Sequence, residues 1–253
     1  MTAWLRFRCC PRPARRWWDG CSKNELQPWK RQMWVIPPVQ NAAFVCQMER
    51  VLDVYQRPYD AARPVVCLDE SPKQLLRESR TPLTLPDGST RYDCEYHRQG
   101  VAQVYMLHEP LAGRRRVQVE DRHDRLTFAR VVARLLEQDY AQVERMTLVL
   151  DNLSAHQPAA FYEVFDPVRA HALLQRVEFV FTPKHGSWLN MAEIEFAALL
   201  THGLPERVPD WSTLQAHCHA WQLARNQLGA PTNWQFTTEK ARIKLKRLYP
   251  TTG

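Results

Sequence analysis

The stretch VEFVFTPKHGSWLNMAEIEF, residues 177–196, contains a strand, a polar loop and the start of a helix. Its first five residues are β-branched or aromatic except for one glutamate, which predicts a strand. Asn190 is a good N-cap for the helix that follows, and Glu193 is placed to close a capping box with it. Two acids, Glu193 and Glu195, lie among the apolar residues of this helix. A strand that leads directly into a helix is typical of an α/β fold.

Two further segments predict buried strands, and both end at an aspartate. The segment RPVVCLDES, residues 63–71, ends at Asp69, and the segment RMTLVLDN, residues 145–152, ends at Asp151. Ligand sites in open α/β sheets lie outside the carboxyl ends of the strands, so both acids are placed to face a cleft. Aspartate is also common after strands for reasons of turn chemistry, so each acid alone has a structural explanation as well.

The rest of the chain completes the predicted sheet. Residues 92–121 predict two or three antiparallel strands with turns near Gly100 and Gly113. Apolar residues at helical spacing predict helices over residues 39–56, 126–140 and 210–228. Strands come first, and helices and strands then alternate, which indicates an α/β fold with a mixed central sheet flanked by helices.

Three acids from these segments suit one kind of chemistry. Carboxylate oxygens are the ligands that Mg²⁺ and Mn²⁺ prefer, whereas zinc sites favour thiolate and imidazole. Two such ions would activate a nucleophile and stabilise the leaving oxygen in phosphoryl transfer. For Glu193 two interpretations remain open at this point, since the capping box alone explains a glutamate there. The helical wheel turns Glu193 slightly more towards the protein interior than Glu195.

Composition and charge indicate a globular protein with one basic end. The chain has 253 residues, of which 45% are hydrophobic, and a formal net charge of +7. Eight Lys or Arg side chains and only two acids fall within residues 1–34, so this arm carries six of the seven net charges. A basic arm indicates a polyanionic partner such as nucleic acid, and a merely solvated terminus is an equally good interpretation.

Other classes of protein are disfavoured. The 7 cysteines are scattered without a Cys-x-x-Cys pair, which argues against a disulfide framework and a thiolate zinc site. Free thiols are expected in a reducing cytoplasm. We find neither an apolar run of about 20 residues nor the apolar core of a secretory signal, so we expect a protein that is neither membrane-spanning nor secreted.

Three motifs resemble those of a known family. VVCLDESPKQLLRE, LVLDNLSAH and TPKHGSWLNMAEIEF are similar to segments of the bacterial insertion-sequence transposases related to mariner, the insertion sequence 630 group. The resemblance implies an RNase H-like fold with an Asp-Asp-Glu triad that binds Mg²⁺ or Mn²⁺, with two ions expected. Matched residue by residue, Asp69, Asp151 and Glu193 are implied as the catalytic metal ligands, and Glu195 as a secondary residue. Glu70 should point to the opposite side of its strand.

The motifs contain other polar residues with predicted roles. Asn152 and His156 are expected to orient Asp151 or bind a substrate phosphate, or else to serve only a turn. Lys184 and His185 are expected to contact the DNA backbone. For Trp188, stacking on DNA and simple packing in the loop both remain open. Asn190 is expected to support the site as a helix cap.

The resemblance also implies a function and partners. It implies cleavage of DNA at the ends of an insertion sequence and strand transfer into target DNA, with a possible homodimer, in a bacterial cytoplasm and associated with the nucleoid. Two alternatives remain: a stand-alone RNase H-like nuclease, and an inactive DNA-binding remnant of a transposase. Family members carry an N-terminal helix-turn-helix region that residues 1–22 do not match, so we expect this chain to be the catalytic half. The predicted organisation is a basic arm or linker over residues 1–38, a catalytic domain over 39–230 and a basic tail over 231–253.

Overall fold

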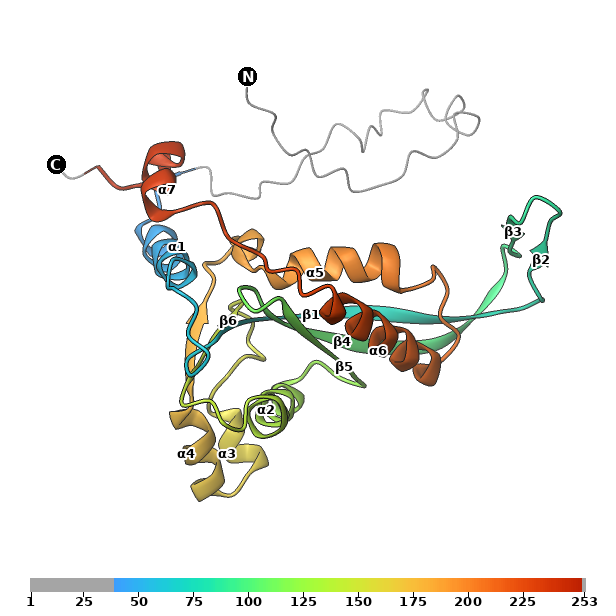
Figure 1. Ribbon diagram of the computed structural model, residues 1–253, viewed down its shortest axis with the longest axis horizontal. Helices are drawn as coiled ribbons and strands as arrows, with labels where there is room; N and C mark the ends of the chain where they lie inside the picture. The colour runs from blue at the N-terminus through green and yellow to red at the C-terminus, as the bar shows by residue number, and fades with distance from the viewer. Residues whose placement is uncertain (1–38, 252–253) are drawn as a thin grey trace. The chain divides into compact units, whose positions relative to one another are not determined.

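A computed structural model describes residues 39–251, and a five-stranded sheet forms its centre (Figure 1). The strand order is β5-β4-β1-β6-β7. β4 is antiparallel to both of its neighbours, β5 and β1, whereas β1, β6 and β7 are parallel. The prediction of a mixed sheet is therefore confirmed. The bounds are β1 (Val65–Glu78), β4 (Tyr96–Glu109), β5 (Arg114–Glu120), β6 (Met146–Leu150) and β7 (Val177–Phe181).

Helices cover both faces of the sheet. Side chains alternate along β1, so that Cys67 enters one hydrophobic cluster while Val66 and Leu68 enter the other. The first cluster holds α1 (Ala42–Tyr55), α5 (Ala192–Ala198), α6 (Trp211–Gln227) and α7 (Thr238–Lys244). The second holds α2 (Arg125–Arg134), α3 (Ala160–Val164) and α4 (Pro167–Gln175), as Figure 1 shows. Within residues 39–251, each helix is too short or too polar to cross a membrane.

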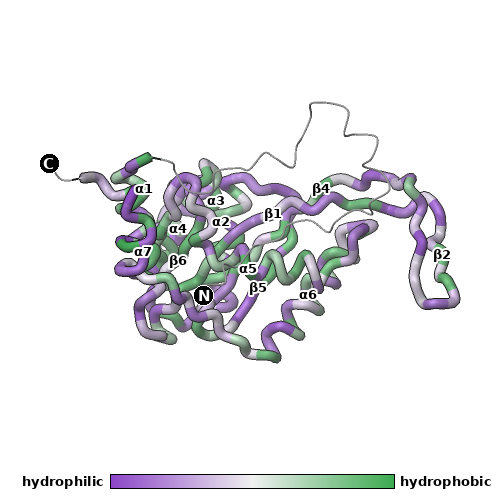
Figure 2. Tube along the Cα trace, turned by 90° about the horizontal axis from the view of Figure 1, so that it is seen from above, coloured by the Kyte–Doolittle hydropathy of each residue, from purple (hydrophilic) through white to green (hydrophobic). Residues whose placement is uncertain are grey.

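The first strand is longer than the sequence predicts. We expected it to end at Asp69, but β1 continues to Glu78 because β4 keeps pairing with it, with Asp69 opposite Met106. What ends near Asp69 is the parallel pairing with β6, whose last partners are Cys67 and Val149. The outer parts of β1 and β4 are largely hydrophilic (purple in Figure 2), since no helix covers them.

Glycines account for one error and one success in the turn predictions. The turn expected near Gly100 is wrong, because Gly100 lies inside β4 with a φ of 102°. The nearby pairing shifts its register between Gln74 and Leu76, and a glycine accommodates such an irregularity without a steric penalty. The turn at Gly113 is confirmed, with a φ of 63° between β4 and β5. A small hairpin of β2 (Leu83–Thr84) and β3 (Thr90–Arg91) joins β1 to β4.

The helix ends follow the capping residues. Asp210 caps α6, since its carboxylate accepts a hydrogen bond from the Thr213 amide at 2.8 Å. Pro167 begins α4 rather than interrupting a helix, which suits its missing amide hydrogen. α2 and α5 each end in a π-helical turn, over Leu135–Asp139 and Leu199–Gly203.

Of the predicted N-terminal arm and C-terminal tail, the structure describes only the tail, as far as residue 251. The basic arm predicted over residues 1–38 lies outside the described residues. The segment after residue 230 packs on α1, where Asn41 donates a backbone hydrogen bond to the Leu248 carbonyl at 3.0 Å. Thr238 Oγ1 donates to Asp53 Oδ1 at 2.7 Å. The boundary at residue 230 stays a prediction.

Candidate active site

Asp69 and Asp151 follow the last paired residues of two neighbouring parallel strands, β1 and β6. Cys67 of β1 is opposite Val149 of β6, and each aspartate follows two residues later in its own strand direction. Because side chains alternate along a strand, both aspartates face the same side as Cys67 and Val149, the side covered by α1 and α5. Adjacent strands are only about 4.8 Å apart, so the two acids are neighbours across the sheet.

The environment of Asp69 disfavours its charge. Burial, together with the negative charges of Glu70, Glu193 and Asp151, raises the pKa of Asp69 to about 8. A hydrogen bond from the Glu70 amide to Asp69 Oδ1, at 3.0 Å, opposes this only weakly. Glu193 and Asp151 therefore lie close enough to Asp69 for their charges to raise its pKa.

Glu193 lies in the first turn of α5, which a single side chain ties to β1. Asn190 Nδ2 donates to the Leu68 carbonyl at 2.7 Å, and Asn190 Oδ1 accepts from the Ala192 amide at 3.1 Å. Asn190 thus joins the start of α5 to the residue before Asp69. Partial burial raises the pKa of Glu193, a hydrogen bond from Ser187 opposes this, and the charge of Asp151 adds to the rise. Its carboxylate is hydrogen-bonded to Ser187. The predicted N-cap at Asn190 is wrong by one residue, because the cap position of α5 is Met191, which makes no side-chain hydrogen bond there. The role of Glu193 as a metal ligand stays a prediction.

Glu70 and His156 support Asp151 from the other face of the sheet. His156 Nδ1 lies 3.0 Å from the Asp151 carbonyl oxygen and 2.8 Å from Asp151 Oδ1, and Nε2 lies 3.1 Å from Glu70 Oε2. Burial alone lowers the pKa of His156, but the hydrogen bonds to Asp151 and Glu70 outweigh it and raise the pKa to about 10. The buried ring also packs on Phe128 at 4.8 Å between centroids. His156 is therefore a buried cation that holds two carboxylates.

The fit of a divalent cation follows from these contacts. Ligand atoms of Glu70, Asp151 and His156 lie within 4.8 Å of one another. However, a protonated imidazole donates hydrogen bonds and does not coordinate a metal. In the described part of the chain, Asp69, Asp151 and Glu193 form no second group at that spacing, so an ion would have to draw them closer. The crowded negative charges around Asp69 would be relieved by a cation. The donor set, all oxygen, fits Mg²⁺ or Mn²⁺.

A cavity of about 370 Å³ opens beside Asp151 and contains the predicted DNA-contacting loop. Exposed Lys184 and His185 line it, and His185 adopts a left-handed φ of 64°. Exposed Asn152 lines it too. Trp188 is half-buried and packs against Phe236 at 6.0 Å between ring centroids. The predicted DNA contacts of these residues stay predictions, and for Trp188 the structure shows the packed arrangement.

Comparison with known proteins identifies the family. A family model described as DDE superfamily endonuclease matches residues 64–215, which include all three predicted acids. The chain belongs to this family. No curated protein matches it.

Solved structures similar to this chain are complexes of the Mos1 mariner transposase. The Mos1 mariner paired-end complex with Mn has 13% sequence identity and a TM-score of 0.55, over 91% of this chain and 69% of that one. The Mos1 paired-end complex with the left transposon end has 12% identity and a TM-score of 0.54, over 90% and 68%. The Mos1 strand transfer complex has 14% identity and a TM-score of 0.51, over 89% and 68%. The shared architecture confirms the predicted RNase H-like fold.

Two groups of site residues were not predicted from the sequence. Glu70 was expected only to point away from Asp69, which it does, but its hydrogen bond to His156 was not foreseen. Glu195 was expected to be a secondary residue that faces the interior less than Glu193. That orientation is wrong, because Glu195 is fully buried in a cluster with Arg115 and Arg225, whereas Glu193 is exposed. A glutamate in an apolar helix face was the available signal, since a buried acid needs a partner.

Proposed function

We propose that this chain is the catalytic domain of a transposase, in which Asp69, Asp151 and Glu193 hold Mg²⁺ or Mn²⁺ at the reacting phosphate. The observation that carries the proposal is the placement of Asp69 and Asp151 on one face of adjacent parallel strands, with α5 tied to the same strand by Asn190. Its family, the DDE superfamily endonucleases, supports the same chemistry.

The reaction has two displacements at phosphorus. In the first, water attacks a phosphodiester at the element end, and the 3′ oxygen leaves and takes up a proton. In the second, that 3′-hydroxyl attacks a phosphodiester of target DNA and displaces its 3′ oxygen. A bound divalent cation would supply charge neutralisation and a more acidic bound water. The acids orient the reactants, and His156 keeps Asp151 in place through its 2.8 Å contact.

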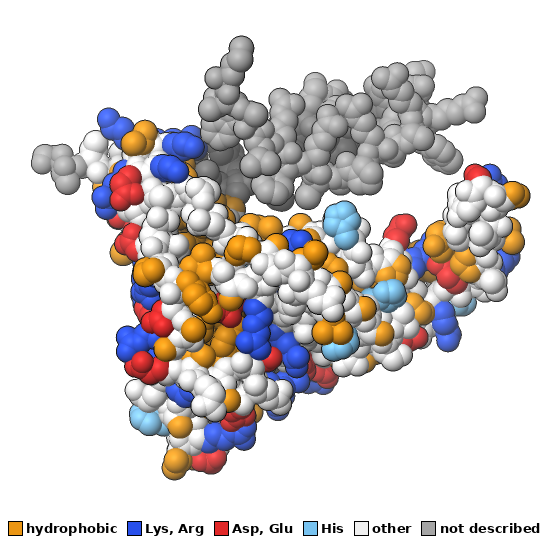
Figure 3. Space-filling view, in the orientation of Figure 1, with side chains coloured by type: hydrophobic (Ala, Val, Ile, Leu, Met, Phe, Trp, Pro, Cys, Tyr) orange, Lys and Arg blue, Asp and Glu red, His pale blue; other side chains and the backbone are white. Residues whose placement is uncertain are grey.

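DNA is the proposed substrate and partner. Lys184 and His185 lie in the cavity beside Asp151, where a phosphate backbone would pass, and Trp188 supports that loop. Lys and Arg side chains also gather around α1 and α7 (blue in Figure 3), where α7 and the turn after it expose Lys240, Lys244, Lys246 and Arg247. Such residues give phosphate contacts without sequence information.

The transposase group, the cellular location, the oligomeric state and the domain organisation are also proposals. The three motifs favour the insertion sequence 630 group and a bacterial cytoplasm with nucleoid association. The similar Mos1 structures include paired-end complexes with Mn and with Mg, which supports a divalent cation in the site and a homodimeric complex on two DNA ends. We propose two ions in each site. We propose a basic arm over residues 1–38, a catalytic domain over 39–230 and a basic tail over 231–253.

A nicking and joining assay tests the function. The full chain is incubated with supercoiled plasmid and a labelled duplex, in Mn²⁺ and in EDTA. We expect Mn²⁺-dependent nicks and joined products, both lost in Asp151→Asn. Asp210→Asn is the matched control, because Asp210 is an exposed cap and asparagine caps equally well.

The same assay separates the alternatives. Nicks without any joining would favour a stand-alone nuclease. DNA binding without nicks, in the wild type as in Asp151→Asn, would favour an inactive remnant and contradict the proposal.

A further inference from the structure

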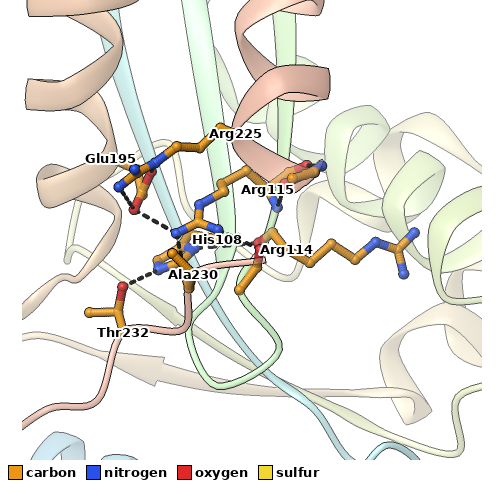
Figure 4. Close-up of polar contacts among 9 residues, drawn as sticks. His108, Arg114, Arg115, Glu195, Arg225, Ala230 and Thr232 are labelled. Carbon is orange, nitrogen blue, oxygen red and sulfur yellow. Dashed lines mark hydrogen bonds and ion pairs between the residues drawn. The ribbon is translucent and has the colours of Figure 1, made fainter. Parts of the chain in front are cut away.

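A buried ion cluster joins α5 to two other elements (Figure 4). Arg115 of β5 donates from Nη2 to Glu195 Oε1 at 2.8 Å. Arg225 of α6 donates from Nε to Glu195 Oε2 at 3.1 Å and from Nη2 to Oε1 at 3.3 Å. The side chains of Arg115 and Glu195 are 0% and 1% exposed, while that of Arg225 is 32% exposed. Glu195 Oε1 therefore accepts from both arginines, and Oε2 accepts from Arg225.

Arg115 makes further hydrogen bonds to the backbone and to Asn226. Its guanidinium donates to the Ala230 carbonyl at 2.9 Å and to the Gly113 carbonyl. Its backbone amide donates to Asn226 Oδ1 at 2.8 Å, and Asn226 Nδ2 donates back to the Arg115 carbonyl at 2.8 Å. These hydrogen bonds hold the Arg115 guanidinium in one position at the edge strand β5, and its hydrogen bond to Glu195 orients that carboxylate.

Glu195 and Glu193 lie on opposite sides of the same short helix. Two residues correspond to a rotation of about 200° about the helix axis. The structure places Glu195 fully buried and Glu193 exposed beside Asp151. A rotation of α5 that moved one carboxylate would therefore move the other by the same angle.

The apolar contacts of α5 do not fix that rotation alone. Phe196 and Leu199 anchor α5 in the core, but hydrophobic contact is not directional. Hydrogen bonds to a carboxylate are directional, and Asn190 fixes only the start of the helix. An ion cluster is also a costly way to gain stability alone, since apolar residues of similar volume often stabilise a core at least as well.

We propose that Arg115, Glu195 and Arg225 form a positioning cluster that sets the rotation of α5 and so aims Glu193 at Asp69 and Asp151. This inference rests on the proposed function, since it needs Glu193 to be a ligand of the catalytic metal. Glu195 then acts through the helix and touches neither metal nor DNA.

The test measures Mn²⁺ binding to the full chain without DNA, by electron paramagnetic resonance of the free ion. In Arg115→Met combined with Glu195→Met, the fully buried pair becomes apolar, while the partly exposed Arg225 can turn to solvent. We expect the Mn²⁺ dissociation constant to rise about tenfold. Arg225→Met keeps the fully buried pair of Arg115 and Glu195, so this variant is the one most certain to fold. For it we expect the Mn²⁺ dissociation constant to rise about threefold. In nicking assays the kcat should fall while the KM for DNA stays unchanged.

The control replaces a comparable ion pair elsewhere. Arg207 and Glu78 lie 2.7 Å apart, with side chains 19% and 21% exposed, and they join the base of the hairpin rather than α5. Arg207→Met with Glu78→Met should leave the Mn²⁺ dissociation constant unchanged. A wild-type dissociation constant in folded Arg225→Met and in the apolar double variant would overturn the positioning role.

Glu193→Gln separates the two proposals. If it weakens Mn²⁺ binding while the cluster variants do not, only the positioning role fails. If the wild type binds no Mn²⁺, or Glu193→Gln binds it unchanged, the proposed function fails and the positioning role with it.

Discussion

Replacing Asp69 with asparagine should stabilise the metal-free protein at neutral pH. The carboxyl lies half-buried in β1, beside the charges of Glu70, Glu193 and Asp151, and its pKa is raised to about 8. In the unfolded chain the pKa of an aspartate is about 3.9. Between these values the folded protein binds more protons than the unfolded chain, so its stability falls as the pH rises.

The size of the effect follows from the same two values. At about pH 7 the raised pKa costs the wild type about 4 kcal/mol of unfolding free energy, and at about pH 5 it costs about 1.5 kcal/mol. Asparagine is neutral in both states and avoids this cost. Asp69→Asn should therefore be more stable than the wild type in EDTA, by a margin that grows with pH across this range.

Urea unfolding in EDTA at the two pH values measures the margin. Added Mn²⁺ should stabilise the wild type by mass action and Asp69→Asn much less. Asp210→Asn, at an exposed cap, should follow the wild type at both pH values. The reasoning is refuted if Asp69→Asn is no more stable than the wild type near neutral pH, or if the two show the same pH dependence.

Three other substitutions probe the support of the site. His156→Phe removes the buried cation between two carboxylates and should lower the unfolding free energy by about 3 kcal/mol, as urea unfolding would show; an unchanged midpoint would contradict the ion-pair assignment. Asn190→Ala leaves the Leu68 carbonyl without its 2.7 Å donor, so the unfolding free energy should fall by about 1–3 kcal/mol and the nicking kcat should fall too. Wild-type values of both quantities would contradict the role of Asn190 in tying α5 to β1. Gly186→Ala places a Cβ 2.5 Å from Pro183 Cγ and should destabilise the loop by about 1–3 kcal/mol in the same assay, and a stability equal to wild type would show that the loop yields freely.

The two aspartates could be predicted because local patterns locate them. Asp69 and Asp151 each follow a buried apolar run, and such runs are visible in one segment of sequence at a time. The end of β1 was predicted wrongly because strand length also depends on the partner strand. β4 pairs with β1 as far as Glu78, and that pairing cannot be read from β1 alone.

The supporting contacts could not be predicted because they join distant segments. His156 and Glu70 are 86 residues apart, and Arg115 and Glu195 are 80 residues apart. Nothing in the run of arginines around Arg115 distinguishes the one that becomes buried. The helical wheel wrongly favoured Glu193 over Glu195 as the inward-facing acid, because the arginines that pair with the buried Glu195 become visible only once β5 and α6 are placed around α5.

Anomalous diffraction from crystals of the full chain soaked in millimolar Mn²⁺ tests the central claim most directly, because it locates the ion. The account predicts a Mn²⁺ peak bonded to carboxylate oxygens of Asp69 and Asp151, with Glu193 drawn towards it and Glu195 still bound to its two arginines. A peak between Glu70 and His156, or a site at Asp69 and Asp151 that stays without a peak, would contradict it.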